Sequence, residues 1–219
     1  MHTANTVAAS KITLSELMLP SHSNFSGKIH GGYLLSLMDQ IAFASASKFS
    51  GCYCVTASVD TVDFLNPVEI GELVTLKASV NYVGNSSMVV GIRVVSENIQ
   101  TGKVKHCNSS YFTMVAKDEN SINVKVPKLI LSNFEEVRRF YDAIRRISPQ
   151  TTLETLIPDF QGNKRNIDRI VQVAPEVVSH NIETVKRLTR KVRVQAKYQT
   201  SLEVLHYLKE EGINRTKSG

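Results

Sequence analysis

Apolar residues recur at helical spacing directly after a pair of glycines, Gly31 and Gly32. The periodic positions are Leu34, Leu35, Leu37, Met38, Ile41, Ala42 and Ala46. This spacing predicts a long apolar helix. One carboxylate, Asp39, lies within the run, where burial without a partner is costly. Because the glycines expose backbone N–H groups at a helix start, which favours negative charge, the segment is a candidate site. A tight turn followed by a helix with a solvent-facing aspartate is the simpler interpretation.

After residue 51 the pattern changes to β-branched, partly alternating runs. They cover about residues 52–65, 72–83, 86–98 and 103–116, and turn residues such as Asn66-Pro67 separate them. One long helix followed by about four long antiparallel strands predicts an α+β domain in which a sheet wraps around the helix.

Beyond about residue 147 the chain changes character. The pattern predicts a strand at 151–157, a helix at 163–173, a strand at 176–179, helices at 181–189 and 200–211, and the start of a strand at 213. Strands that alternate with helices imply βα units with parallel pairing. We therefore divide the chain into a domain at 1–131, a connecting helix at 132–147 and a βα segment at 148–219.

The net charge of +6 comes almost entirely from the second half. Residues 131–219 hold 16 Lys and Arg against 11 Asp and Glu, whereas residues 1–130 hold 10 against 9. The basic stretch from Lys186 to Arg193 raises nucleic-acid binding as an alternative. It has no aromatic neighbour except Tyr198 and no recognised nucleic-acid motif, so we interpret it as a solvated helix face and expect no nucleic-acid partner.

Targeting signals are absent from the sequence pattern. No apolar run reaches the roughly 20 residues that a membrane helix needs, so we expect no membrane span. The first residues lack a basic region followed by an apolar core, which argues against a secretory signal. Cys52, Cys54 and Cys107 form no disulfide framework. Their pattern is typical of strand packing in a reducing cytoplasm, where we expect the protein.

The first half contains a series of five motifs. They are Asn24-Phe-Ser-Gly27-Lys-Ile-His30-Gly31-Gly32, Met38-Asp39, Val55-Thr56-Ala-Ser-Val-Asp60, Asp63-Phe64-Leu-Asn-Pro67 and Val83-Gly84-Asn85-Ser86-Ser87. Together they resemble the acyl-CoA thioester hydrolases of the hotdog fold. The resemblance runs from about residue 14 to about residue 131, with the motifs in the family's order and spacing. It implies a hotdog fold and hydrolysis of acyl-CoA to a fatty acid and coenzyme A, a reaction of lipid metabolism.

The resemblance also implies roles for individual residues. Asp39 is the expected general base that activates water, with the alternative that it is the nucleophile. Asn24 of a facing subunit is expected to orient the water or the carbonyl. The N–H groups around Gly31 and Gly32 would polarise the thioester oxygen, and one such donor is typically worth about 3 kcal/mol of barrier height. We group His30 with these glycines as a candidate for binding the thioester. Histidine can act as a catalyst near neutral pH, but the resemblance assigns His30 no chemical role, and packing at the loop is its simpler role. The reaction requires no metal and no cofactor beyond coenzyme A within the substrate.

Substrate contacts are expected from three further places. We interpret Thr56 as lining the acyl tunnel, on the same strand face as Asp60 because of their even spacing. Phe64 is expected to affect the tunnel depth. Gly84, Ser86 and Ser87 form a candidate hairpin turn that also contacts coenzyme A, with a plain turn as the alternative. Lysines for the coenzyme A phosphates are Lys28, Lys48, Lys77 and Lys103. The family resemblance implies a homo-oligomer, at least a dimer, and a trimer of dimers by analogy with relatives.

The segment from about 148 to 219 resembles a different family, lipoyl synthase. The motifs are Ser148-Pro-Gln-Thr-Thr-Leu-Glu154 with Pro158-Asp159-Phe160-Gln-Gly162, Ala174-Pro-Glu-Val-Val-Ser-His180-Asn181-Ile-Glu183, and Thr216-Lys-Ser-Gly219. The resemblance implies an internal slice of a (βα) barrel. All three cysteines lie before this segment, so it has no ligands for an iron–sulfur cluster.

Three functions remain open at this stage. The first is an acyl-CoA thioesterase. The second is a lipoate-pathway protein that is catalytically incomplete for lack of cluster cysteines. The third is a hotdog module that binds acyl-CoA without catalysis. Release of free thiol from acyl-CoA separates the first function from the third, and iron and sulfide content after anaerobic reconstitution separates the first from the second.

Overall fold

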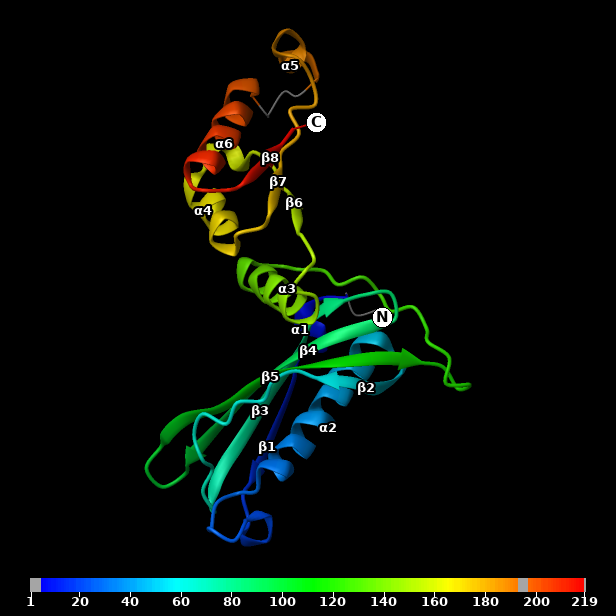
Figure 1. Ribbon diagram of the computed structural model, residues 1–219, viewed down its shortest axis with the longest axis vertical. Helices are drawn as coiled ribbons and strands as arrows, with labels where there is room; N and C mark the ends of the chain where they lie inside the picture. Colours follow the sequence, from blue (N-terminus) through cyan, green and yellow to red (C-terminus); the bar gives the residue numbers. More distant parts are fainter. Residues whose placement is uncertain (1–4, 193–196, 219) are drawn as a thin grey trace. The chain divides into compact units, whose positions relative to one another are not determined.

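The structure, a computed structural model, describes residues 5–192 and 197–218 (Figure 1). It divides into two compact units, Met1–Ile147 and Ser148–Gly219. Arg193 and Gly219, which belong to the basic stretch and to the closing motif of the sequence, lie outside the described residues. Among the residues that are described, no helix is both long and apolar enough to cross a membrane.

The first unit is built on a five-stranded antiparallel sheet with the strand order β1-β3-β4-β5-β2. The strands are β1 (Ile12–Leu17), β2 (Tyr53–Val59), β3 (Glu72–Val83), β4 (Ser87–Asn98) and β5 (Lys103–Lys117). The three long strands follow the sequence prediction closely because glycine and asparagine turns end each of them. Among the described residues β2 pairs only with β5, so its other edge has no strand partner there.

One long helix, α2 (Gly31–Ser50), packs in the curl of this sheet (Figure 1). It begins where the His30 side chain caps the Gly32 N–H, and it ends at Gly51, whose φ of 71° is left-handed. Its buried residues include Leu34, Leu37, Met38, Ile41, Ala42, Ala46 and Phe49. They pack against inward-facing strand residues such as Leu76 and Phe112. A sheet wrapped around a central helix confirms the predicted hotdog architecture.

The other face of the sheet carries α3 (Phe134–Ile147). The rings of Tyr82 and Phe140 lie 5.4 Å apart, which anchors the middle of the helix on β3. Near its end, the Arg146 guanidinium lies 4.9 Å from the centre of the Tyr111 ring and donates to Asp60 at 3.1 Å. The predicted connecting helix therefore belongs to the first unit. Two short helices, α1 (Val7–Ser10) and η1 (Pro20–His22), lie on either side of β1 in the sequence.

The second unit contains a three-stranded parallel sheet in the order β6-β7-β8. Its elements are β6 (Glu154–Leu156), η2 (Phe160–Gly162), α4 (Lys164–Val173), β7 (Val177–Ser179), α5 (Lys186–Val192), α6 (Tyr198–Glu210) and β8 (Arg215–Lys217). Its small core is formed by Ile157, Ile167, Val178, Val204, Leu208 and Ile213. Parallel strands with helices between them confirm the predicted βα organisation.

Several element boundaries in this unit differ from the prediction, and two late starts have a clear cause. The helix expected at 181–189 begins only at Lys186, because Glu183 has a left-handed backbone (φ 64°) that a helix cannot contain. The strand expected from 151 begins at Glu154, since a turn closes from the Thr151 N–H to the Ser148 carbonyl at 2.9 Å.

Candidate active site

Asp39 projects from the third turn of α2 and is exposed in the single chain. The Thr56 hydroxyl on β2 donates to Asp39 Oδ1 at 2.5 Å. Asp39 Oδ2 has no hydrogen-bond partner among the described residues. The burial expected from the apolar sequence around Asp39 is therefore wrong for one chain, because Asp39 lies on the side of α2 that the sheet leaves uncovered. The contact pairs a carboxylate with a hydroxyl donor and leaves one oxygen free.

An open depression lies beside Asp39. Its lining comes from one stripe of α2 and from the end of β2 with the loop that follows, and it consists of Gly32, Leu35, Ser36, Asp39, Val59, Asp60, Val62 and Phe112. Ser36 is absent from the predicted site. Its spacing of four residues from Gly32 and three from Asp39 places all of them on one helix face, which is a signal that the sequence does contain.

A β-bulge in β2 changes which side chains face the depression. Thr56 pairs with Met114, but Ser58 pairs with Thr113, so Ala57 is an extra residue without a partner. The predicted common face of Thr56 and Asp60 is therefore wrong, because one inserted residue reverses the alternation of the strand. Asp60 instead forms the ion pair with Arg146.

Asn24 lies in the loop before α2, and its side chain is held by that loop. Its Oδ1 accepts hydrogen bonds from the Ser26 N–H at 2.9 Å, the Ser26 hydroxyl at 2.7 Å and the Lys28 N–H at 3.2 Å. Three donors saturate this oxygen. The side chain can therefore offer only its amide N–H groups, as a donor, to another molecule.

The start of α2 presents one free donor. The Gly32 N–H donates to His30 Nδ1 at 3.0 Å. This N–H and this ring nitrogen, both from residues of the predicted site, are therefore not available to a substrate. The Gly31 N–H has no partner among the described residues. The Phe64 ring lies over Gly31, where an added Cβ would be 3.2 Å from Phe64 Cζ. A side chain at position 31 would therefore displace the Phe64 ring by a few tenths of an ångström. Phe64 lies next to the helix start, and its contact with the substrate stays a prediction.

A cluster of polar and aromatic side chains supports this end of the helix. The His22 and Tyr33 rings stack with their centres 4.0 Å apart, and the Tyr33 hydroxyl donates to Glu16. This hydrogen bond to Glu16 raises the pKa of Tyr33, so the hydroxyl stays protonated at neutral pH. This cluster could not be predicted from the sequence, because its members come from three separate segments.

The predicted hairpin at Gly84, Ser86 and Ser87 joins β3 to β4. The Gly84 N–H donates to the Ser87 carbonyl at 2.8 Å, and the Ser86 carbonyl accepts from the Ala116 N–H at 2.9 Å. These bonds satisfy the turn within the chain. A coenzyme A contact at the hairpin stays a prediction.

Asn24 and Asp39 do not meet within one chain as the structure describes it. Asp39 lies eight residues beyond the first residue of α2, which is about 12 Å along the helix axis, and Asn24 precedes the helix. No contact that joins the two side chains occurs among the described residues.

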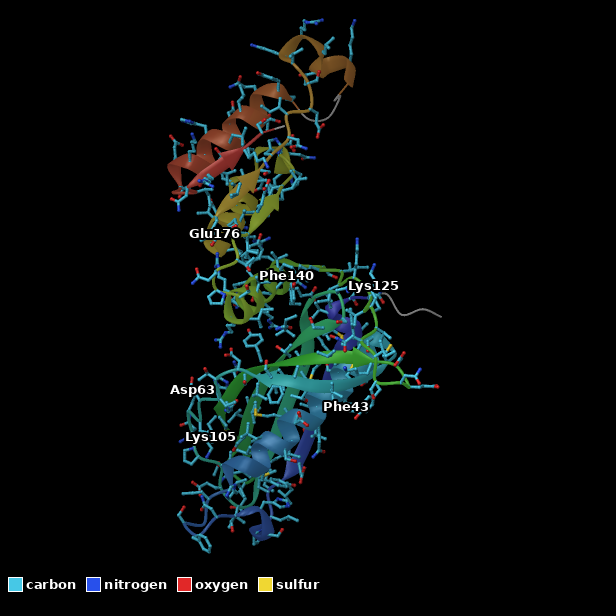
Figure 2. The ribbon with its side chains drawn as sticks, turned by 45° about the vertical axis from the view of Figure 1, so that its right-hand side comes forward. Phe43, Asp63, Lys105, Lys125, Phe140 and Glu176 are labelled. Carbon is cyan, nitrogen blue, oxygen red and sulfur yellow. The ribbon has the colours of Figure 1, made fainter. Side chains whose placement is uncertain are left out.

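Apolar side chains are exposed beside the unpaired edge of β2. Tyr53 and Val59 on β2 are 62% and 44% exposed, and Phe43 on α2 is 39% exposed. The Phe43 and Tyr53 rings lie 5.7 Å apart, edge to face, and Figure 2 labels Phe43 on α2. An unpaired strand edge next to exposed aromatic side chains has the character of an interface.

Residues 26–103 match the family model of the thioesterase superfamily. Protein VdlD of Helicobacter pylori is 42% identical over 149 residues, which cover 68% of this chain and 85% of VdlD. A hexameric acyl-CoA thioesterase of known structure is 35% identical, with a TM-score of 0.64, and the match covers 66% of this chain and 92% of that one. This chain belongs to the thioesterase superfamily.

This thioesterase superfamily member is also similar to an acyl-CoA hydrolase from Staphylococcus aureus, with 27% identity and a TM-score of 0.62. The structure of that enzyme was solved in complex with butyryl coenzyme A and coenzyme A. The match covers 77% of this chain and 95% of that one. Structures of that enzyme include replacements by alanine of an asparagine, an aspartate and a threonine. These three are separated by 15 and 17 positions, as are Asn24, Asp39 and Thr56 in this chain.

The second half of this thioesterase superfamily member is similar to lipoyl synthases. The mitochondrial lipoyl synthase of Nematostella vectensis is 79% identical over 77 residues, which cover 35% of this chain. The chain spans about a quarter of the length of that enzyme, 26%. A hotdog thioesterase domain is thus followed by a lipoyl-synthase-like segment.

Proposed function

We propose that this protein hydrolyses acyl-CoA thioesters to a carboxylic acid and coenzyme A. The observation that carries the proposal is the Asp39 carboxylate, held at one oxygen by Thr56 and facing an open depression. The acyl-CoA thioesterases among the similar structures support the same substrate class.

The chemistry follows from the two oxygens of Asp39. Thr56 fixes Oδ1, so Oδ2 takes the proton of a water molecule as that water attacks the thioester carbonyl carbon. The tetrahedral intermediate then expels the coenzyme A thiolate, which takes up a proton, and the acid remains. This route uses water alone as co-substrate and needs no metal or other cofactor.

The developing oxyanion needs donors, and two are supplied by the loop and the helix start. The Gly31 N–H is unpaired among the described residues and lies at the positive end of α2. The Asn24 amide N–H groups are the other donor, because saturation of Oδ1 fixes the amide in one orientation. Asn24 is therefore assigned to the carbonyl oxygen rather than to the attacking water.

Asn24 and Asp39 act together only across subunits in this proposal, since they lie apart in one chain. A partner that pairs through the edge of β2 would cover the apolar side chains there and desolvate Asp39. The active unit is then at least a dimer, and the hexameric thioesterase among the similar structures supports a trimer of dimers. The equal spacing of asparagine, aspartate and threonine in the S. aureus enzyme supports the same three residues.

The lipoyl-synthase-like segment has no catalytic part in the proposal. All three cysteines of the chain, Cys52, Cys54 and Cys107, lie in the first unit, so the second unit supplies no thiolate for a cluster. Sulfur insertion is therefore not assigned to it.

The test is the release of free thiol from acyl-CoAs of two to sixteen carbons by the full chain and by residues 1–147. We expect comparable rates from both, with Thr56→Val reducing both. Binding of acyl-CoA without thiol release would contradict hydrolysis and favour the third function, a hotdog module that binds acyl-CoA without catalysis. Activity that disappears in a folded truncation would assign a working role to the second unit.

A further inference from the structure

A second hollow lies on the face of the sheet opposite α2. It has a volume of about 570 Å³, with β3 and β4 as its floor and α3 as one wall. Volumes of this size suit small ligands. Because α2 and Asp39 belong to the other face, this hollow is separate from the proposed thioester site. Figure 2 labels Phe140 on the helix that forms the wall.

The hollow is strongly basic. Its cationic lining residues are Lys11, Lys77, Arg93, Arg138 and Arg139, and its one carboxylate is Asp142. Lys77 stands directly opposite Arg93 in the β3–β4 register, an arrangement that is destabilising for like charges. Lys77, Arg93 and Arg139 have no ion pair among the described residues. The surplus of positive charge is thus unbalanced within the unit.

The floor contains a buried amide that points into the hollow. Asn81 is only 4% exposed, and its Oδ1 accepts from the Ser79 hydroxyl at 3.0 Å. Its Nδ2 has no acceptor among the described residues. Asn81 is the extra residue of a β-bulge, since Val80 pairs with Val90 and Tyr82 with Val89. Bulges re-aim side chains and are frequent beside binding sites.

Gly91 makes room for this amide. A Cβ at Gly91 would lie 2.4 Å from Asn81 Nδ2, so any larger residue would displace it. The hollow therefore combines cations at its rim with an amide donor from a largely buried residue at its floor. Both kinds of group require an acceptor.

We propose that this basic hollow binds a small anion that carries two phosphate groups. Arg138 pairs with Glu135, which lies outside the hollow, so four cations remain against the Asp142 carboxylate, and this surplus is close to the charge of a diphosphate. Arginine guanidinium groups bind phosphate oxygens with paired hydrogen bonds, and lysine adds a point charge. The Asn81 amide supplies the uncharged donor that orients one phosphate. The diphosphate of coenzyme A and that of a free nucleotide share this chemistry.

The test is titration calorimetry of the full chain with inorganic pyrophosphate. We expect saturable binding that Arg93→Gln and Lys77→Gln each weaken by about tenfold, the effect of one lost charge-assisted hydrogen bond. Lys128→Gln is the matched control, because Lys128 is exposed, lies outside the hollow and forms no ion pair among the described residues. It should bind like the wild type.

Two outcomes overturn the proposal. One is no saturable binding at millimolar pyrophosphate, and the other is equal weakening by Lys128→Gln and Arg93→Gln. Circular dichroism confirms that each variant is folded, and the Asp39→Asn variant, altered on the opposite face, should keep full pyrophosphate affinity even if hydrolysis fails. Displacement of pyrophosphate by coenzyme A, compared with ADP, then identifies which diphosphate occupies the hollow.

Discussion

Asp39 and Thr56 form the contact on which the proposed hydrolysis depends. If Asp39 is the general base, Asp39→Asn should reduce turnover by about 100-fold or more, because a positioned base commonly contributes 10²–10⁴. The measurement is thiol release at saturating acyl-CoA. Asp63→Asn, a carboxylate change on the loop after β2, is the matched control and should keep its activity. A folded Asp39→Asn variant with nearly normal turnover would contradict the assignment.

Single-turnover hydrolysis in ¹⁸O-labelled water tests for a nucleophilic Asp39. A base leaves the label in the released acid only. A nucleophilic Asp39 forms an anhydride with the acyl group as the coenzyme A thiolate leaves, and water that attacks the Asp39 carbon of this anhydride places the label in Asp39 and an Asp39 oxygen in the acid. Mass spectrometry of the peptide that contains Asp39 detects this label, and its presence would identify Asp39 as the nucleophile.

Ser26 is a positioning residue for Asn24, since its N–H and hydroxyl both bind Asn24 Oδ1. Ser26→Ala should lower turnover by about tenfold, the effect of one hydrogen bond on the orientation of the amide. Ser26→Thr, which keeps the hydroxyl, should restore the rate. In an Asn24→Ala background, Ser26→Ala should have no further effect. Equal losses in both backgrounds would show that Ser26 acts on folding alone.

At the scale of residues, the sequence indicates which residues belong to the candidate site but not which atoms they contact. Asp39 stands out because it interrupts an apolar helix, yet its partnership with Thr56 joins a helix to a strand 17 positions away and has no local signal. The hydrogen bond from the Gly32 N–H to the His30 side chain could not be predicted either, because it depends on the rotamer that His30 adopts as the helix cap. Ser36 was predictable from helical spacing.

At the scale of elements, periodicity and turn residues predict most of the fold. The runs at 72–83 and 103–116 match β3 and β5 closely, because alternating burial is a strong signal in a sheet with one face on the core. The bulge at Ala57 was not predictable, since β-branched residues continue through it. The late start of α5 depends on the left-handed Glu183, a conformation that non-glycine residues seldom signal.

Glu154 connects all three strands of the second unit. It accepts from the Ser179 hydroxyl on β7 and from Lys217 on β8 at 3.3 Å. Both hydrogen bonds lower the pKa of Glu154 below its usual 4.5, and the bond from Ser179 has the larger effect. Because the pKa of Glu154 is lower in the folded state than in the unfolded state, its ionisation stabilises the sheet at pH values above the unfolded-state pKa. This stabilisation is lost as the pH falls through the folded-state pKa.

We therefore expect the β6–β8 amides to lose protection from hydrogen exchange as the pH falls below about 4.5. Glu154→Gln should remove most of this pH dependence, because it cannot ionise. Glu203→Gln, on an exposed position of α6, is the control and should behave like the wild type. The same pH dependence in Glu154→Gln would assign the effect to other groups.

At the scale of the whole molecule, the proposed site needs two chains. Inactive Asn24→Ala and inactive Asp39→Asn chains, mixed under conditions that exchange subunits, should recover part of the activity, because a mixed dimer rebuilds one intact site. The recovery is measured as thiol release after exchange is verified by mass spectrometry of differently labelled chains. No recovery after verified exchange would place each site within one chain.

The two hydrophobic cores share no residue, so we expect the two units to unfold in separate thermal transitions. Scanning calorimetry should show two heat-absorption peaks. Leu208→Ala, which removes a fully buried side chain from the second core, should cost about 2–5 kcal/mol and shift one peak only. Leu76→Ala should shift the other peak, and one peak that moves with both changes would contradict this separation. Heat would then inactivate the thioesterase at a temperature that substitutions in the appended segment leave unchanged.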